Sequence, residues 1–240
     1  MKIYGDTDIG RSRSFNQDAY ENTVLPGGAV LSVVCDGMGG AAAGDIASKK
    51  AAECITEYVK KSYFPDIDDF SVEKILRSAV TSANIEIYDM SVKTPEYQGM
   101  GTTAVVALIR EGKAHIVHVG DSRAYLIGDD ILQITRDHSV VQNMVEIGQL
   151  TKEEARRHPQ KNVITRAVGT REDVICDYNE VDIGGKTLLV CTDGLSGMLS
   201  DEEISGAVKN YPAEDLPAEL IRLANEKNST DNITVTVISE

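Results

Sequence analysis

Four short apolar runs follow one another between residues 103 and 135, and a turn containing glycine separates each run from the next. The runs are residues 103–109, 114–119, 124–127 and 131–135, and the turns are Glu111-Gly112, Gly120-Asp121 and Gly128-Asp129. Connections this short join antiparallel strands, because parallel strands need a crossover of a dozen residues or more. The chain is therefore expected to contain an antiparallel meander.

Helical segments are expected in pairs on either side of this meander. Apolar positions recur at helical spacing in residues 44–63 and 71–92, with Ser71 as the expected N-cap, and again in 201–209 and 215–228. Further strands are expected at 29–35, 174–181, 187–191 and 233–238, and a polar, irregular stretch at 138–166. This order favours an α+β fold with helix pairs outside two antiparallel sheets. No linker or repeat interrupts the 240 residues, so we expect a single domain over residues 1–240.

Charge and cysteine content narrow the partners and the compartment. Lys and Arg number 24 against 38 Asp and Glu, a net charge of −14, which disfavours nucleic acid and anionic membranes as partners. The four cysteines form no C-x-x-C pair and no zinc spacing with the histidines. The N-terminus lacks the apolar region of a leader, and no run approaches about 18 apolar residues. We expect a soluble, cytoplasmic monomer.

Aspartates stand beside four of the expected strands. Asp36, Asp121 and Asp193 each follow an apolar strand, and Asp231 precedes the last one. Each of them alone is an ordinary turn signal. If the strands bring the four together, their carboxylates repel one another and need a cation. Oxygen ligands without histidine or thiolate select a hard ion, Mg²⁺ or Mn²⁺.

The glycines after Asp36 admit a second interpretation. Residues 37–42, GMGGAA, fit the G-x-G-x-x-A dinucleotide fingerprint, with Glu57 about 20 residues further on. The fingerprint places its acidic residue at the end of a second parallel strand, whereas Glu57 falls inside an expected helix. A nucleotide-dependent oxidoreductase is therefore an alternative that predicts a parallel sheet.

Two arginines near the N-terminus, Arg11 and Arg13, are the remaining basic element. They are either a solvated pair or, beside carboxylates and metal, a candidate phosphate clamp. The second interpretation follows from the guanidinium fork, which matches phosphate oxygens bidentately.

Seven motifs, taken together, resemble those of bacterial type 2C, metal-dependent protein serine/threonine phosphatases (the PPM family), in the same order and along essentially the whole chain. They are Arg13-Ser14-Phe15-Asn16-Gln17-Asp18, Asp36-Gly37-Met38-Gly39-Gly40, Gly99-Met100-Gly101-Thr102-Thr103, Gly120-Asp121-Ser122-Arg123, Asp137-His138-Ser139, Thr192-Asp193-Gly194 and Asp231-Asn232-Ile233-Thr234. The resemblance implies a four-layer α-β-β-α sandwich with two antiparallel sheets flanked by helix pairs. It also implies a binuclear Mg²⁺ or Mn²⁺ centre between the sheets.

The resemblance assigns metal ligands by position. Asp36 would bridge both ions, with the Gly37 carbonyl on the first ion and with Asp193 and Asp231 on the second. Asp121, together with Asp193, matches a third metal site known in bacterial members. Two or three ions are therefore expected.

Further roles are implied around these ligands. Arg13 matches the phosphate-binding arginine, and Asp18 matches an outer-shell residue that reaches a metal through water. Residues 145–166 correspond to the mobile flap beside the active site. The implied reaction is attack on phosphorus by a metal-activated water, in line with the departing Ser or Thr oxygen and without a phosphoenzyme.

One position departs from the family pattern. Members typically read D-G-M-G-G-H, with the histidine proposed as general acid for the leaving group, and here that position is Ala41. General acid catalysis is worth about 10²–10⁴-fold, so we expect a slow enzyme. The origin is open between an engineered substitution, a natural variant using water as the acid, and a pseudophosphatase. The intact metal and arginine positions favour an engineered variant of an active phosphatase, and the location of the His138 motif in the family argues against His138 as a substitute acid.

The expected function is hydrolysis of phosphoserine and phosphothreonine in proteins, opposing a bacterial serine/threonine kinase. The kinase itself is an expected partner and substrate. The alternative on the same fold is a non-catalytic regulator that binds phosphoproteins.

Overall fold

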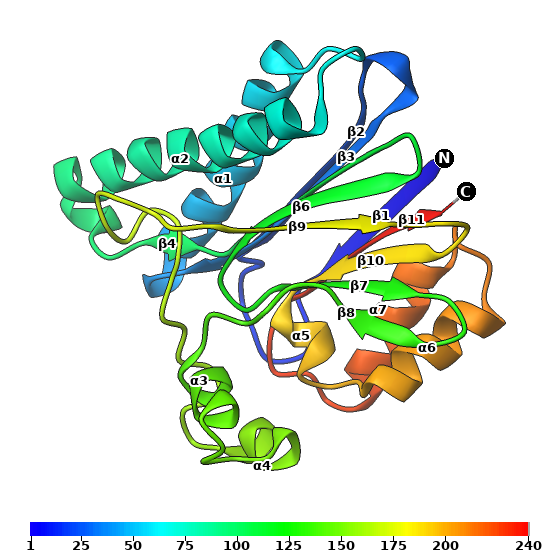
Figure 1. Cartoon of the computed structure of the whole chain (residues 1–240). Coiled ribbons are helices and arrows are strands. Elements are labelled where there is room, and N and C mark those ends of the chain that lie inside the picture. Colours follow the sequence, from blue (N-terminus) through cyan, green and yellow to red (C-terminus); the bar gives the residue numbers. More distant parts are fainter. Residues whose placement is uncertain (240) are drawn as a thin grey trace.

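Two antiparallel sheets form the centre of the molecule (Figure 1). The computed structural model describes residues 1–239, except for the side chains of Ala41 and Ala42. The first sheet has the order β1-β11-β10-β7-β8, with the strands β1 (Lys2–Asp8), β11 (Ile233–Ser239), β10 (Thr187–Cys191), β7 (Arg123–Ile127) and β8 (Ile131–Gln133). The second has the order β2-β3-β5-β6-β9, with β2 (Asp18–Val24), β3 (Val30–Met38), β5 (Ala104–Arg110), β6 (Lys113–Val119) and β9 (Asp177–Asp182), and the short β4 (Gly101–Thr102) pairs with β3.

Helices cover the outer face of each sheet, as the sequence predicted. The long helices α1 (Gly40–Ser62) and α2 (Asp69–Lys93) lie on the second sheet, and α5 (Asp193–Ser196), α6 (Asp201–Asn210) and α7 (Leu216–Glu226) lie on the first (Figure 1). Short 3₁₀ turns occur at Pro26–Gly28 and Pro95–Tyr97. The expected four-layer α-β-β-α sandwich is confirmed.

Strand β5 is apolar throughout because both of its faces are buried. Val106 and Leu108 pack with the core beneath α1 and α2, whereas Val105 and Ala107 pack in the core between the two sheets. Successive side chains of a strand point to opposite faces, so a strand buried on both faces carries no polar alternation. The three cores of the molecule are thus separated by the two sheets.

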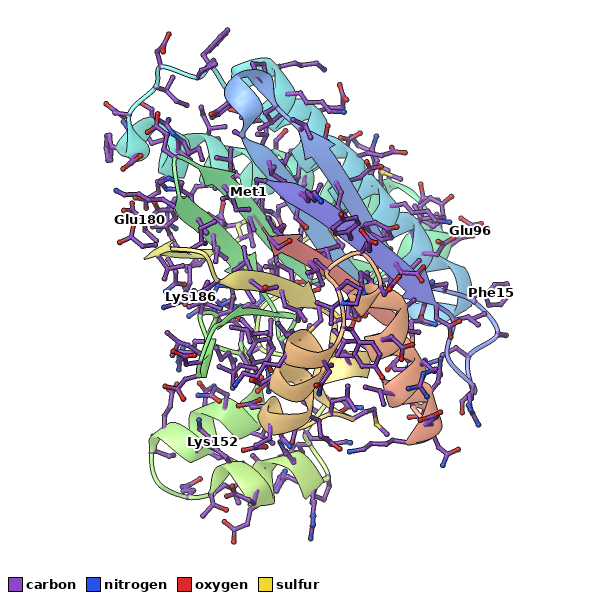
Figure 2. The ribbon with its side chains drawn as sticks, turned by 90° about the vertical axis from the view of Figure 1, so that its right-hand side faces the viewer. Met1, Phe15, Glu96, Lys152, Glu180 and Lys186 are labelled. Carbon is purple, nitrogen blue, oxygen red and sulfur yellow. The ribbon has the colours of Figure 1, made fainter. Side chains whose placement is uncertain are left out.

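Residues 138–166 were expected to be irregular, but they contain two short helices. They are α3 (Val140–Glu146) and α4 (Lys152–Arg157); they project below the sandwich in Figure 1, and in Figure 2 they lie beneath the C-terminal helices. Ser139 caps α3, and Thr151 forms a capping box with Glu154 at α4. We call residues 140–163 the α3–α4 excursion; its base is closed by a bridge between Ser139 and Ile164.

Two local expectations were wrong, and two strands were missed. Asp68, not Ser71, is the N-cap of α2, because its carboxylate accepts the Ser71 N–H at 2.7 Å. Strand β3 does not end before Asp36 but continues to Met38, because β4 supplies a partner for its last residues. The strands β1 and β2 were not expected at all.

The fold also decides between the two functional alternatives for the glycine-rich turn. Every strand pair within residues 1–239 is antiparallel, whereas dinucleotide binding at such a turn requires a parallel sheet. The oxidoreductase alternative is therefore wrong. In the same described part of the chain, no helix combines the length and the apolar character that crossing a membrane requires.

Candidate functional site

One cavity of about 450 Å³ collects predicted site residues from both ends of the chain. Its lining includes Arg13, Asp36, Gly37, Asp121, Asp193 and Asp231. They come from the loop before β2, the end of β3, the loop after β6, the start of α5 and the loop before β11. The four aspartates that the sequence analysis placed beside strands therefore do meet. Arg13 lines the cavity and Arg11 does not.

The end of β3 is fixed by close backbone packing. The Asp36 N–H donates to Thr103 Oγ1 at 2.9 Å, and the Thr103 N–H donates to the Asp36 carbonyl at 2.8 Å. A Cβ atom on Gly37 would lie 2.1 Å from the Gly44 carbonyl oxygen, so only glycine allows the first turn of α1 to approach the strand. This packing holds the Asp36 carboxylate at the cavity wall.

Asp18 lies beside Asp36 in the β2–β3 register but does not line the cavity. Its Oδ2 accepts hydrogen bonds from two hydroxyls of the other sheet, Thr192 Oγ1 at 2.8 Å and Thr234 Oγ1 at 2.7 Å. Burial raises the pKa of Asp18 to about 7, although the two hydroxyls work against the shift. Asp18 therefore joins the two sheets directly behind the cavity.

The loop that carries Arg13 is held in place by Asn232. The Asn232 side-chain amide donates to the carbonyls of Ile9 and Phe15 at 2.8 and 3.0 Å, and its Oδ1 accepts the Gln17 N–H at 2.8 Å. Arg13 can then reach across the cavity, where its Nη2 donates to Asp231 Oδ2 at 2.8 Å.

The Arg13 side chain is half-exposed. The hydrogen bond to Asp231 is the main cause of its raised pKa, and the nearby Asp36 and Asp193 carboxylates add to it. The guanidinium is thus a fixed cation at the mouth of an acidic cavity.

The carboxylates of the cavity are buried or partly buried, and they repel one another. Burial, together with repulsion from neighbouring aspartates, raises the pKa of Asp36 well above its ordinary value, that of Asp121 to about 8 and that of Asp193 to about 6. The Asp193 Oδ1 atom is buried without a hydrogen-bond partner. Arg13 alone cannot neutralise four carboxylates.

The residues present therefore fit divalent metal ions. The donors converging on the cavity are carboxylate oxygens, and none of its described lining residues is a histidine or a cysteine. Such a donor set suits Mg²⁺ or Mn²⁺, and a cation would stabilise the ionised form of every buried carboxylate. Asp36, Asp121, Asp193 and Asp231 are the residues that could hold these ions.

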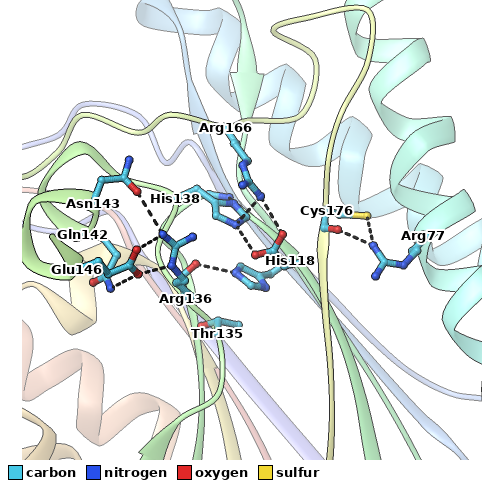
Figure 3. Close-up of polar contacts among 12 residues, drawn as sticks. Arg77, His118, Thr135, Arg136, His138, Gln142, Asn143, Glu146, Arg166 and Cys176 are labelled. Atoms are coloured by element: carbon cyan, nitrogen blue, oxygen red, sulfur yellow. Dashed lines mark hydrogen bonds and ion pairs between the residues drawn. The ribbon is translucent and has the colours of Figure 1, made fainter.

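Two other groups of histidine and carboxylate side chains have atoms within 4.8 Å of one another. In the first, His118, His138 and Asp177, the Arg166 guanidinium donates to Asp177 Oδ1 at 2.8 Å (Figure 3). A protein cation already neutralises this group.

In the second group, Asp69, His115 and Glu180, the Lys113 ammonium lies 3.0 Å from both carboxylates. This carboxylate pair also has its cation within the protein. Neither group lines the cavity of Asp36.

Sequence reasoning missed the residues that orient the site. Thr192 and Thr234, which bind Asp18, and Asn232, which holds the Arg13 loop, stand inside recognised motifs, yet nothing in one dimension shows which strands face each other. The prediction for Ala41 concerns a side chain outside the described ones, so the structure says nothing of it.

Comparisons with known proteins place this geometry in a family. The family model described as "Protein phosphatase 2C" matches residues 7–234. The protein phosphatase PhpP of Streptococcus pneumoniae is 38% identical over 243 residues, which cover 100% of this chain and 97% of that protein. The serine/threonine phosphatase stp of Listeria monocytogenes is 35% identical, over 97% of this chain and 93% of that protein.

Solved structures agree with these relatives. The serine/threonine phosphatase Stp1 from Staphylococcus aureus superimposes with a TM-score of 0.95 at 37% identity, covering 100% of this chain and 94% of that one. The Mycobacterium tuberculosis serine/threonine phosphatase PstP/Ppp gives a TM-score of 0.88 at 33% identity, covering 98% of this chain and 97% of that one. The likeness extends over both sheets and their helices.

Proposed function

Because this chain belongs to the protein phosphatase 2C family of serine/threonine phosphatases, we propose that it hydrolyses phosphoserine and phosphothreonine in proteins, in the cavity of Asp36, by a metal-dependent reaction. The proposal rests on one observation: Arg13, Asp36, Asp193 and Asp231 all line the same acidic cavity. An arginine beside carboxylates is the combination that binds phosphate and metal together.

Asp36, Gly37, Asp193 and Asp231 are proposed to hold two ions, and Asp121 a third. When bound, Mg²⁺ or Mn²⁺ would supply the Lewis acidity that activates water for in-line attack on phosphorus. The raised pKa values of Asp36 and Asp193 and the unpartnered Asp193 Oδ1 support this assignment. Asp18 is proposed to reach a metal only through water, since its Oδ2 is already held by two threonines and it does not line the cavity.

Arg13 is proposed to bind the phosphate oxygens. Its side chain is half-exposed and its only described ion pair is with Asp231, which a metal at Asp231 would weaken. The guanidinium can then turn its second N–H toward an equatorial phosphate oxygen and stabilise the charge that develops there. Arg13, whose loop is held by Asn232, is thus proposed to orient the substrate.

Proton donation to the leaving group is the weak step of the proposal. Position 41 is alanine, which has no proton to give. His138 does not replace it, because its side chain is buried, does not line the cavity, and binds Asp177 through Nε2. We therefore propose slow turnover for esters with a poor leaving group.

The test is release of inorganic phosphate from a phosphothreonine peptide at increasing Mn²⁺. The expected result is turnover that rises with Mn²⁺, is abolished by a chelator, and is lost in Asp36→Asn. Metal-independent release, or equal release by Asp36→Asn, would contradict the assignment of the cavity.

Position 41 favours one second candidate, a regulator that binds phosphoproteins without hydrolysing them. The same titration separates the two, because a binding module retains the labelled peptide and releases no phosphate. An opposing kinase as partner, the monomeric state, the cytoplasmic location and the role of residues 145–166 as a flap stay predictions.

A further inference from the structure

A second cavity, of about 170 Å³, lies beneath the α3–α4 excursion. It shares Asp121, Asn162, Asp193 and Asp231 with the cavity of Asp36, so the two meet along one wall. A protein substrate whose phosphorylated residue occupies the first cavity has its neighbouring residues at this junction. We call the second cavity the flanking cavity.

The excursion presents positive charge to the flanking cavity. Lys152, Ala155 and Arg156 line it from α4, whereas Glu153, Glu154 and Arg157 of the same helix do not. Residues three and four apart share a helix face, so α4 turns two of its three cations toward the cavity and its two acids away. Lys161 adds a third cation from the segment after the helix. Lys152 is labelled on the excursion in Figure 2.

These cations are largely without partners. Among the described residues, Lys152 and Lys161 have no carboxylate within 4.0 Å, and Arg156 has one distant contact, 3.8 Å from Nη2 to Asp201 Oδ1. Arg123, which also lines the cavity, is different, because its guanidinium is neutralised by Asp137 at 2.7 Å. The cavity also has five acidic lining residues: Asp137 is paired with Arg123, Asp201 faces Arg156, and Asp121, Asp193 and Asp231 belong to the proposed metal site. The free positive charge is therefore on the excursion side, opposite the metal site.

Such a concentration of unpaired cations is unusual in a chain of net charge −14. Other lysines of the fold, such as Lys49, Lys93 and Lys227, are paired with acids. Unpaired cations that face a cavity next to a phosphate site attract an anion. The apolar side chains of Val141 and Met198 in the same cavity offer surface to the methylenes of a bound side chain.

We propose that the flanking cavity binds an anionic side chain of the substrate, a carboxylate or a second phosphate, close in sequence to the phosphorylated residue. The proposal rests on the proposed function and specifies its substrate class: acidic or multiply phosphorylated segments. Lys152 and Lys161 are its main determinants, and Arg156 contributes after release from Asp201. Because the two cavities share one wall, the anion lies close in sequence to the phosphorylated residue, and peptides with the charge at successive positions locate it.

The test compares phosphothreonine peptides that carry one Glu, one phosphoserine or one Gln at successive positions on either side. We expect kcat/KM to be about fivefold to tenfold higher for the anionic peptides at the responsive position, since one exposed ion pair is worth up to about fivefold and two lysines act together. Phosphoserine should exceed Glu if a second phosphate is the preferred ligand. The preference should shrink in about 0.5 M salt, where charges are screened.

Variants assign the effect to the cavity. The double variant Lys152→Ala/Lys161→Ala should lose the preference, and Lys152→Glu should reverse it toward peptides with a flanking Lys. Arg157→Ala is the matched control, because it removes a cation from the same helix outside the cavity, and it should leave the preference and the turnover of an aryl phosphate unchanged. A preference that persists in the double variant would overturn the proposal.

A binding measurement separates this proposal from the proposed function. Anisotropy of labelled peptides that carry a non-hydrolysable phosphonate reports binding whether or not turnover occurs. Tighter binding of the anionic peptide, lost in Lys152→Ala/Lys161→Ala, supports the flanking cavity even if no peptide is hydrolysed. Equal binding of anionic and neutral peptides contradicts it even in an active phosphatase.

Discussion

Gly120 and His138 exchange two hydrogen bonds: the Gly120 N–H donates to His138 Nδ1 at 3.1 Å, and the His138 N–H donates to the Gly120 carbonyl at 2.9 Å. Because Nδ1 accepts, the proton of the neutral ring is on Nε2, which faces Asp177 Oδ2 at 3.2 Å (Figure 3). Gly120 immediately precedes Asp121, so this histidine of the Asp-His-Ser motif holds the loop that carries a proposed metal ligand.

Replacing His138 should therefore destabilise the protein by leaving the Gly120 N–H unsatisfied. We expect His138→Phe to lower the free energy of unfolding by about 1–3 kcal/mol, the usual cost of a buried donor without a partner. His138→Asn keeps an acceptor near the position of Nδ1 and should cost less. Urea denaturation of the two variants measures the difference, and equal losses would show that the hydrogen bond to Gly120 is not the cause.

The stacked pair of His118 and His138, whose ring centroids are 4.7 Å apart, should make stability depend on pH. Burial is the main cause that lowers the pKa of each ring; Asp177 raises both values, Asp137 also raises that of His118, and Arg166 lowers both. The unfolded chain then binds more protons than the native one below about pH 6.5. The contribution of the pair to stability is thus complete above that pH and is lost as the pH falls toward the folded pKa.

His118→Gln isolates this effect. The Gln amide can still donate to the Arg136 carbonyl, which His118 Nε2 contacts at 2.8 Å, but it does not titrate. Between about pH 7.5 and pH 5.5 the wild-type protein should lose more unfolding free energy than the variant. The carboxylates of the metal cavity are common to both proteins and cancel in the difference. Parallel pH curves would contradict this prediction.

Neutralising one carboxylate of the cavity should stabilise the metal-free protein. Asp36 is buried among like charges, so Asp36→Asn in the presence of a chelator should raise Tm. At a Mn²⁺ concentration one hundred times the Kd, the free energy of unfolding of the wild-type protein should rise by about 2.7 kcal/mol, and that of Asp36→Asn should rise much less. Thermal unfolding with and without Mn²⁺ measures both effects. Asp130→Asn, at an exposed turn, is the control and should change neither.

Removal of Arg13 should weaken catalysis through phosphate binding. A hydrogen bond to a charged group is worth about 1.5–3 kcal/mol, so kcat/KM of Arg13→Ala should fall about 10- to 100-fold. Arg13→Lys keeps the charge without the guanidinium fork, so its kcat/KM should lie between those of the wild type and Arg13→Ala. Arg11→Ala removes a neighbouring cation that does not line the cavity and should behave as the wild type. Equal effects at both positions would indicate that only the net charge matters.

Restoring a histidine at position 41 should accelerate the protein substrate most. We expect Ala41→His to raise turnover of a phosphothreonine peptide by up to about 10²–10⁴-fold, the range of general acid catalysis. An aryl phosphate, whose leaving group needs no proton, should gain far less. Ala41→Gln fills the same position without an acid and serves as the control. An equal gain on both substrates would argue against a missing general acid.

The sequence predicted the strongly apolar elements and the residue types of the site, and it failed where the signal depends on a partner strand. The meander and the long helices were readable because their apolar spacing is local. β1 and β2 were not, because they lie at the sheet edges and keep polar residues on half-exposed faces. That Asp36 and Asp193 line the same cavity was only a hypothesis from the sequence, because it depends on how the two sheets pack against each other.

The support of the site was still less predictable. That Asp18 is held by threonines of the opposite sheet depends on how the sheets face each other, which no spacing records. The inward cations of α4 were equally hidden, since the segment was expected to be irregular. Its capping box, Thr151 with Glu154, was the local signal that could have revealed the helix.

The pairing of β1 with β11 has a consequence for biosynthesis. Arg13 and Asp18 leave the ribosome early, whereas Asp231 and Thr234, which bind them, leave it more than 200 residues later. A nascent chain therefore has every early residue of the cavity and none of the late ones. We expect ribosome-bound chains arrested before residue 231 to release no phosphate, because Asp231 and the strand that follows it, which complete the cavity, are then missing.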